Sequence, residues 1–424
     1  MRLFHERLNG WTSISDTFIA FFANQPGCFW LDREHHAQER FSVIGAGARV
    51  TELNPPTFDE DLDLPFRFRP GFVGVIHYPE QAGQLGAVDG LAVDRAFVYD
   101  HDARAMHFVG LFENQEAFQG WFHAALLRLG LLAGDAASHA MNTTSATVAV
   151  LTPRIKRDEY LDRIRACQKH IAQGDVYQIC LTTKIEGDYS GDELSYFLRL
   201  RKDNPAPYTS FVRVGKTSYV SISPERFITV HGGRVLSSPI KGTRPRSSDP
   251  QEDQQFIEEL GTDAKERAEN LMIVDLIRND LSIACEASSI AVESLLAVKS
   301  YSTVHQLVSD VSGELRDGKT GLDALLALLP GGSMTGAPKL SAINILTQLE
   351  DGSRDGYSGG IGWVDGNWNM ELGMVIRTAV FDSGKVSIGI GGGITSDSVP
   401  AREHDEIVLK SNALVRALGA SVSW

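Results

Sequence analysis

The sequence has 424 residues, of which 43 % are hydrophobic, and this is enough apolar material for a large buried core. Its formal net charge of −14 argues against nucleic-acid binding, because contact with phosphates needs a basic surface. No apolar run approaches the roughly 20 residues of a membrane span, and residues 1–10 lack the layout of a signal peptide. We therefore expect a cytoplasmic protein, built as one large unit or as two lobes.

The four cysteines are too few and too scattered for a disulfide framework or a zinc site. None of them belongs to a CxxC pair. We expect each to be a small buried hydrophobic residue. They are Cys28, Cys167, Cys180 and Cys285.

The first 130 residues or so alternate short strand-like runs with turn signals, which predicts antiparallel sheet. A helix is predicted over 115–132, where apolar residues recur at helical spacing. The small, polar segment 134–146 shows no periodicity and is predicted to be a linker. No chemical motif occurs in this part. The predicted strands are 28–32, 41–45, 71–78 and a hairpin over 96–109 that turns at 100–104.

The chain then alternates helix and strand up to an informative hairpin. Helices are predicted over 156–172, before Gly174, and from Gly191 to Arg201. The hairpin has strands 227–231 and 234–238 around a Gly-Gly turn. If residue i pairs with residue 465 − i, Glu225 lies opposite Ile240, one step from Lys241, so that a carboxyl group and an amine meet at one end. The other predicted strands are 176–184, 210–214 and 217–223.

Lys241 is the centre of the run SSPIKGTRPR and is predicted to lie in a short turn between Pro239 and Gly242. A lysine at its reference pKa has only about 0.04 % of its amine uncharged at neutral pH, so a nucleophilic lysine needs burial or nearby cations. Arg244 and Arg246 could lower the pKa of Lys241. From these residues alone, an ordinary surface lysine in a Pro/Gly loop remains an alternative.

Two predicted helices, 262–281 and 400–418, each carry a pair of glutamates three residues apart on one face. Two such pairs can converge on a hard cation. Because neither pair contains histidine or cysteine, magnesium is the natural choice. Solvated acidic faces near helix N-termini remain an alternative. The pairs are Glu266 with Glu269 and Glu403 with Glu406.

Between these helices lie the loop PGGSMTGAPK, which opens a helix, and a terminal sheet with strands 359–365, 371–381 and 386–390. Pairing across the last turn sets Arg377 opposite Ile390, beside a run of three glycines. Backbone N–H groups next to a guanidinium make a carboxylate receptor, although a bulge at a strand end is an alternative. His305 could be an acid or base, or a structural residue.

Together these stretches resemble the chorismate-utilising enzymes. The resemblance is specific from about residue 154 to residue 419, where the family's motifs occur in order. The first 150 residues match more weakly. The motifs are Ser223-Pro224-Glu225, PIKGTRPR, KERAENLMIVDLIRND, the run 302–308, PGGSMTGAPK and GGGIT followed by Asp397-Ser398.

Two positions distinguish branches within this family. Members that add water have a lysine base where Gln178 stands, so water chemistry is disfavoured. Anthranilate-forming members have alanine where Lys241 stands, whereas aminodeoxychorismate-forming members have lysine. The anthranilate-forming members have a motif of the type PAGTLSG where this sequence has PGGSMTG. This difference also favours the aminodeoxychorismate-forming branch. Ser282, Ile283, Ser341, Val399 and His404 depart from the family's usual residues.

The resemblance implies an α+β fold with two antiparallel sheets packed face to face, helices outside and the site between the sheets. Residues 1–146 would contribute β-structure to this sandwich, and residues 147–424 would form the chorismate-binding catalytic region. The implied reaction is amination of chorismate at C4 to 4-amino-4-deoxychorismate through a lysine-bound intermediate. Anthranilate synthesis, or chorismate binding without activity, are the alternatives.

The resemblance also implies roles for individual residues. Lys241 would attack ring C2 while Glu225 donates a proton to the leaving hydroxyl. Ammonia would come from a separate glutamine amidotransferase subunit, because no cysteine lies in a glutaminase-like motif. The implied catalytic residues are Lys241, Glu225 and His305; the substrate-binding residues are Gly242, Thr243, Thr335, Tyr357, Arg377, Gly391, Gly392, Gly393 and Lys410; and the Mg2+ ligands are Glu266, Glu269, Glu403 and Glu406.

Overall fold

The structure is a computed structural model that describes residues 1–34, 40–59, 61–132, 150–301 and 304–424. The linker expected at 134–146 and the first two residues of the run 302–308 lie outside these ranges. In the part of the chain that is described, no helix is long and apolar enough to cross a membrane.

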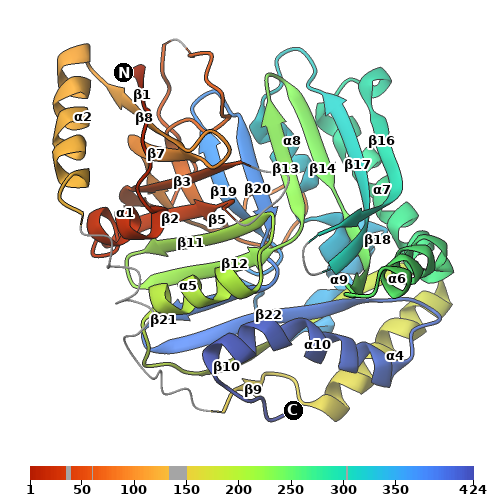
Figure 1. Ribbon diagram of the computed structural model, residues 1–424. Coiled ribbons are helices and arrows are strands. Elements are labelled where there is room, and N and C mark those ends of the chain that lie inside the picture. The colour runs from red at the N-terminus through yellow and green to blue at the C-terminus, as the bar shows by residue number, and fades with distance from the viewer. Residues whose placement is uncertain (35–39, 60, 133–149, 302–303) are drawn as a thin grey trace.

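Two antiparallel β-sheets form the body of the molecule (Figure 1). The first has 12 strands. Residues 1–146 and residues 147–424, the two regions expected from the sequence, both contribute strands to it. Its order is β1 (Arg2–Leu8), β8 (Ala105–Phe112), β7 (Arg95–Asp100), β3 (Phe41–Ala46), β2 (Gly27–Asp32), β11 (Tyr208–Val214), β12 (Thr217–Ser223), β21 (Thr378–Asp382), β22 (Lys385–Ile394), β10 (Gln178–Asp188) and β18 (Gly336–Ala337), with β9 (Thr152–Pro153) beside β10.

The second sheet has 10 strands and likewise combines early and late segments of the chain. Its order is β15 (Ile240–Pro245), β17 (Val304–Glu314), β14 (Arg234–Ser238), β13 (Arg226–His231), β20 (Met370–Met374), β19 (Gly360–Asp365), β5 (Gly71–Ile76), β6 (Val88–Ala92) and β4 (Ala48–Val50), with β16 (Ala291–Ser300) beside β17.

Helices cover the outer faces of these sheets (Figure 1). The expected fold of two antiparallel sheets with helices is thus confirmed. The helices are α1 (Ile14–Phe21), α2 (Gln115–Leu129), α4 (Arg157–Gln173), α5 (Glu193–Asp203), α6 (Pro250–Thr262), α7 (Ala264–Ala284), α8 (Gly321–Leu328), α9 (Lys339–Leu349) and α10 (Pro400–Leu418).

Strand β2 shows how the layers are held together. All six of its residues are buried, since one face packs under helices and the other packs between the sheets. Cys28 and Trp30 belong to the cluster under the helices of the first sheet, whereas Phe29 and Leu31 belong to the cluster that joins the two sheets. The alternation of side chains along a strand explains this division. A strand covered on both faces is mostly apolar, and the one charged residue of β2, Asp32, pairs with Arg201 at 2.8 Å.

All four cysteines are buried and unpaired, as expected. The predicted helix ends are also confirmed. Helix α4 ends at Gly174 in the left-handed conformation, and α10 begins at Pro400 and ends before Gly419. These are the favoured positions for glycine and proline at helix termini.

Two expectations about local structure were wrong, and one helix was missed. Lys241 does not lie in a turn, because β15 continues past Pro239 and pairs with β17, with a bulge at Gly242. The single strand expected over 371–381 is two strands, β20 and β21, which belong to different sheets. Helix α6 was not predicted at all. The 465 − i pairing holds near the turn of the β13–β14 hairpin, but a bulge shifts it by one at Arg226.

The chain passes between the sheets several times, and two of these crossings are hydrogen-bonded to each other. One is the junction between β12 and β13, at Pro224-Glu225, and the other is the junction between β20 and β21. The N–H of Met374 donates to the carbonyl of Glu225, with an N···O distance of 3.0 Å, so the two junctions are hydrogen-bonded to each other. Glu225 and Arg377, at these junctions, lie outside the regular hydrogen-bonded strands, and the side chains of both line the cavity described below.

Candidate functional site

A cavity of about 680 Å³ lies between the ends of the two sheets. That is large enough for a small substrate. Strands β22 and β10 contribute from the first sheet and β15 and β17 from the second, together with the N-terminal turns of α7 and the middle of α10. The predicted site residues that line it are Glu225, Lys241, Gly242, Thr243, Glu266, Glu269, Tyr357, Arg377, Gly391, Gly392, Gly393, Glu406 and Lys410.

Glu225 lies at the first junction between the sheets and is only 6 % exposed. Its Oε1 accepts a hydrogen bond from the Ser333 hydroxyl at 2.8 Å. Burial raises the pKa of Glu225 to about 7, although the Ser333 hydrogen bond and the charges of Lys241 and Lys410 act in the opposite direction. A carboxyl group in this state is partly protonated near neutral pH and can donate a proton.

Lys241 extends from β15 into the cavity. Burial alone would lower its pKa, but nearby acids, Glu269 foremost, outweigh burial, so the pKa of Lys241 lies above its usual value. The expectation that Arg244 and Arg246 lower this pKa was wrong. Arg244 pairs with Asp263 at 3.0 Å and Arg246 pairs with Asp253 at 2.9 Å, so acids compensate both charges.

The bulge at Gly242 helps to place Lys241. Gly242 has φ +76°, a conformation that favours glycine. A Cβ at this position would lie 2.7 Å from Leu260 and 3.1 Å from Glu266. The close approach of α6 and α7 to β15 therefore depends on glycine at this position.

The two glutamate pairs meet at the α7 and α10 end of the cavity. Asp263 caps α7 by accepting the N–H of Glu266 at 3.0 Å, which sets the first pair in the first turns of the helix. Burial, and then the charges of Glu269 and Glu406, raise the pKa of Glu266. Lysines lie among the acids: Lys265 Nζ is 3.0 Å from Glu403 and 3.8 Å from Glu269.

This donor set fits a hard divalent cation in chemistry, since all four side chains offer carboxylate oxygens and repel one another when ionised. Across the described ranges, however, no three metal-ligating side chains are close enough together to hold one ion directly. Glu403 does not line the cavity, and its Oε1 accepts the hydrogen bond from Lys265. A cation there would displace Lys265 or bind partly through water.

The cavity also contains positive charge. Arg377 lies at the second junction between the sheets with φ +50°, an uncommon conformation for a residue with a side chain. Among the described residues, no ion pair within 4.0 Å involves Arg377 or Lys241. An arginine without a partner inside a cavity is suited to bind a carboxylate.

The three glycines of β22 let other side chains approach the cavity. A Cβ on Gly393 would lie 2.8 Å from Gln178 Nε2, 3.3 Å from Glu269 Oε2 and 3.6 Å from Lys241 Nζ. A Cβ on Gly392 would meet nothing closer than 3.8 Å. Gly393 is therefore the position at which several groups of the site converge.

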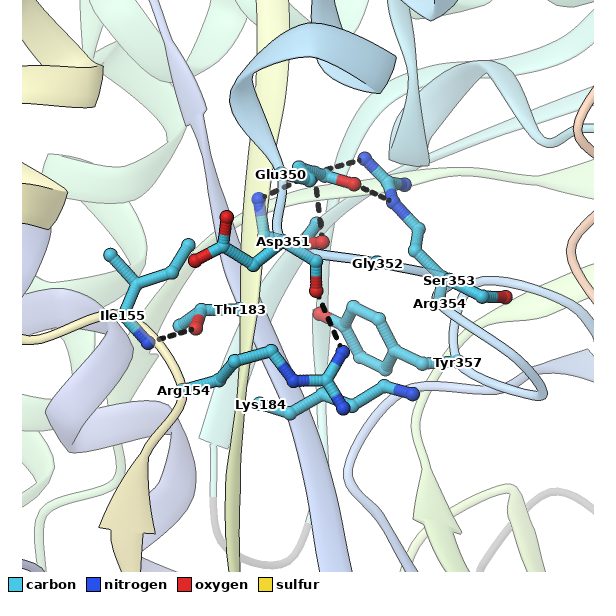
Figure 2. A pocket seen from close by; sticks show the side chains of 11 residues that line it. Arg154, Ile155, Thr183, Lys184, Glu350, Asp351, Gly352, Ser353, Arg354 and Tyr357 are labelled. Atoms are coloured by element: carbon cyan, nitrogen blue, oxygen red, sulfur yellow. Dashed lines mark hydrogen bonds and ion pairs between the residues drawn. The ribbon is translucent and has the colours of Figure 1, made fainter.

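Tyr357 lines the cavity and also a small hollow of about 10 Å³ (Figure 2). Ionic contacts around this hollow fix the loop that carries Tyr357. Glu350 pairs with Arg354 at 2.7 Å and accepts the backbone N–H of Thr182 on β10 at 2.8 Å. Lys184 of the same strand pairs with Asp355. The ring of Tyr357 is thus held against the first sheet.

Besides Glu403, two predicted site residues do not line the cavity. His305 is fully buried, and its ring bonds Ser300 at 2.8 Å and Asp253 at 2.9 Å, so it joins β16, β17 and α6. These contacts indicate that His305 holds neighbouring elements together and does not act as an acid or base on a ligand in the cavity. Thr335 is also fully buried, and its hydroxyl donates to the Gly331 carbonyl at 3.1 Å.

Sequence reasoning missed several polar residues of the cavity, among them Lys265, Ser333 and Gln306. Ser333, which holds Glu225, lies in the PGGSMTG motif, so the motif was found but its role was not. Gln306 follows His305 on β17 and lines the cavity in its place. Strict alternation along a strand puts neighbouring side chains on opposite faces, so one of the two had to face away.

Comparisons with known proteins agree with this geometry. The model of a family described as "chorismate binding enzyme" matches residues 62–416. An aminodeoxychorismate synthase of Streptomyces griseus is 39 % identical over 84 % of this chain and 51 % of the relative. An aminodeoxychorismate synthase component 1 of Escherichia coli K12 is 35 % identical over 86 % of this chain and 79 % of the relative.

An anthranilate synthase component 1 of Thermus thermophilus is also similar, with 33 % identity over 95 % of this chain and 94 % of the relative. The solved structure of anthranilate synthase component I from Streptococcus pneumoniae TIGR4 has a TM-score of 0.78 at 24 % identity, covering 89 % of this chain and 92 % of that one. This structural likeness bears on the fold alone. The chain spans about half the length, or less, of the first curated relatives it matches.

Proposed function

The chain belongs to the family of chorismate-binding enzymes, and we propose that it aminates chorismate at C4 with ammonia to give 4-amino-4-deoxychorismate. The observation that carries this proposal is that Lys241 and a protonatable Glu225 line the same cavity. An amine that can attack and an acid that can release a leaving group are what a two-step substitution needs. Relatives named aminodeoxychorismate synthase support the same reaction.

The charges of the cavity suit a substrate with two carboxylates. Arg377 and the backbone of Gly391–Gly393 would bind the pyruvyl carboxylate, with Tyr357 beside them, and Gly242 and Thr243 would line the ring. Magnesium held by the four glutamates of α7 and α10, partly through water, would neutralise the ring carboxylate. Lys410 adds a further positive charge beside Glu406, at 2.7 Å.

The chemistry proceeds in two substitutions. The uncharged amine of Lys241 forms a bond to ring C2, both conjugated ring double bonds shift by one position, and the C4–O bond breaks as Glu225 gives its proton to the departing hydroxyl, which leaves as water. Ammonia then forms a bond to C4, both ring double bonds shift back, and the bond from C2 to Lys241 breaks. The product keeps its pyruvyl group. Because Lys241 begins as a cation, it must first lose a proton, and Glu269 is the acid with the strongest influence on its charge.

The ammonia would be produced by a separate glutamine amidotransferase subunit. A glutaminase nucleophile must be accessible, and all four cysteines of this chain are buried. Relatives named "component 1" point to a further component. Free ammonium would serve as a poorer nitrogen source, and we place the reaction in the cytoplasm.

Anthranilate synthesis is the second candidate, since a relative with that name matches nearly the whole chain. One assay separates the possibilities. The chain is incubated with chorismate, Mg2+ and ammonium, with and without aminodeoxychorismate lyase. Formation of 4-aminobenzoate only with the lyase supports the proposal, and direct formation of fluorescent anthranilate supports the second candidate. Binding of chorismate without any turnover would contradict both.

A further inference from the structure

We propose that Gln306 is a further substrate-binding residue, whose side-chain amide accepts a hydrogen bond from the substituent on C4 of the ring. That substituent is the hydroxyl group in the substrate and the amine in the product. This inference rests on the proposed function, because it names the group of that substrate which Gln306 contacts.

The position of Gln306 on β17 places it beside the reacting groups. Its neighbours on the strand, His305 and Leu307, are fully buried, whereas Gln306 lines the cavity. Across the ladder it pairs with Thr243, and the next pair along is Leu307 with Lys241. The amide of Gln306 therefore belongs to the same stretch of the β15–β17 ladder as the proposed nucleophile.

The side chain of Gln306 has an unmet hydrogen-bonding requirement. It is only 5 % exposed, and its Oε1 is buried without a hydrogen-bond partner in the part of the chain that the structure describes. Buried polar atoms are nearly always paired, because an unpaired one loses its contact with water and gains nothing in return. An unpaired acceptor on the wall of a cavity is the usual sign of a group that a ligand completes.

The chemistry of the amide narrows which group of the substrate it binds. Arg377, Lys241 and Lys410 are cations and suit carboxylates, and the glutamates of α7 and α10 suit a metal ion. Gln306 is neutral and suits an uncharged donor. Besides its two carboxyl groups, chorismate has one hydroxyl group, at C4, and the amine that replaces it also carries N–H donors. Both can donate to Oε1 of Gln306, so one residue serves substrate and product.

A substrate cycle tests this assignment. Dissociation constants are measured by calorimetry, with Mg2+ present, for wild type and Gln306→Met, with chorismate and with an analogue that lacks the C4 hydroxyl. Methionine keeps the length of the side chain and removes the amide. We expect Gln306→Met to weaken chorismate binding about five- to tenfold, which is the range for one hydrogen bond. Binding of the analogue should change less than about twofold.

The control is Thr229→Val. Thr229 lies on β13 of the same sheet, its hydroxyl is also buried without a partner among the described residues, and it does not line the cavity. We expect this variant to bind both ligands like wild type. Circular dichroism and thermal unfolding confirm that each variant is folded.

The outcomes separate the two proposals. If Gln306→Met weakens the binding of chorismate and of the analogue equally, Gln306 only packs against the ring. If it weakens the binding of neither ligand, water satisfies the oxygen of Gln306. Either result overturns the assignment. If the cycle shows the expected coupling but wild type makes no aminodeoxychorismate, the assignment of Gln306 stands and the proposed reaction fails. If wild type does not bind chorismate, both fail.

Discussion

At the scale of single residues, the cavity holds an acid and an amine that need opposite protonation states. Glu225 must carry a proton to act, and Lys241 must lose one. The structure favours the first requirement, because burial keeps Glu225 protonated up to about pH 7. It does not favour the second before substrate binds, because the acids around Lys241 raise its pKa.

The raised pKa of Glu225 predicts the basic side of the pH profile. An acid with a pKa of about 7 is protonated below that pH and ionised above it. We expect kcat/KM for amination to fall about tenfold per pH unit above pH 7. The measurement holds the concentration of uncharged ammonia constant at each pH, since that concentration itself rises with pH.

Ser333→Ala is the matched variant for this profile. The Ser333 hydroxyl stabilises the ionised form of Glu225, so its loss should raise the pKa of Glu225 further and move the fall in rate to higher pH. A profile that did not move in Ser333→Ala would show that the titrating group is not Glu225.

Removal of the proposed nucleophile gives a second prediction. Lys241→Ala should lower kcat for amination by about 10² or more, because the covalent step is lost. Chorismate binding by the variant is measured separately, to distinguish lost chemistry from lost affinity. Near-complete activity over a range of ammonium concentrations would exclude a covalent role and leave direct attack by ammonia.

At the scale of elements, helix ends were predictable from sequence and strand junctions were not. Pro400 and Gly419 mark the ends of α10 by their own backbone preferences, which no distant contact changes. The segment 371–381 contains no proline and a single glycine, so no local turn signal reveals that it divides between two sheets. The division depends on pairing with β13 and β12, far away in sequence.

The same distinction holds for the site. The glutamate pairs could be found because three-residue spacing on a helix is a local rule. Whether His305 or Gln306 faces the cavity depends on which face of β17 meets the other sheet, and the sequence of β17 is polar at both positions. The pairing of Lys241 with Glu225 was expected at one end of the hairpin, and the bulges at Gly242 and Arg226 that adjust it were not.

Adjacent glycines of β22 provide a matched pair of variants. Gly393→Ala would push a methyl group to 2.8 Å from Gln178 and 3.3 Å from Glu269, whereas the methyl of Gly392→Ala meets nothing closer than 3.8 Å. We expect Gly393→Ala to lower kcat/KM at least about tenfold more than Gly392→Ala, since misplacing reacting groups is costly. Steady-state kinetics, with thermal unfolding as the check on folding, test this; equal losses would show that β22 shifts to make room.

The first turns of α7 and α10 predict how metal binding responds to charge. Lys265 neutralises Glu403 and Glu269 in this structure, so it competes with a cation for the same carboxylates. We expect Lys265→Met to tighten Mn2+ binding about tenfold, or about 1.4 kcal/mol, measured by calorimetry or electron paramagnetic resonance. Lys319→Met is the control, because Lys319 pairs with Asp323 on α8 at 2.9 Å. Weaker binding in Lys265→Met would mean that the lysine instead holds the acids in place.

At the scale of the whole molecule, the cavity belongs to both sheets. Strands β10 and β22 of the first sheet and β15 and β17 of the second all contribute to its walls. A ligand that binds there stabilises the contact between the sheets as well as the strands it touches.

This arrangement predicts where ligand binding slows amide hydrogen exchange. With Mg2+ and saturating chorismate, we expect slower exchange in β10 and β22 and also in β15 and β17, measured by mass spectrometry of peptides. Strand β1, at the far edge of the first sheet, is the internal reference and should change little. Protection confined to one sheet would place the ligand against that wall only.

Two of the junctions at which the chain changes sheets, β12–β13 and β20–β21, carry the proposed proton donor and the proposed carboxylate-binding arginine. Glu225 and Arg377 are therefore each fastened to both sheets, and a hydrogen bond from Met374 to Glu225 ties the junctions together. Sliding of one sheet over the other would pull the acid away from the ring that the arginine anchors. The rate of turnover should therefore depend on the relative position of the two sheets. A substitution that weakens the packing between the sheets would slow the reaction even if every residue that contacts the ring is unchanged.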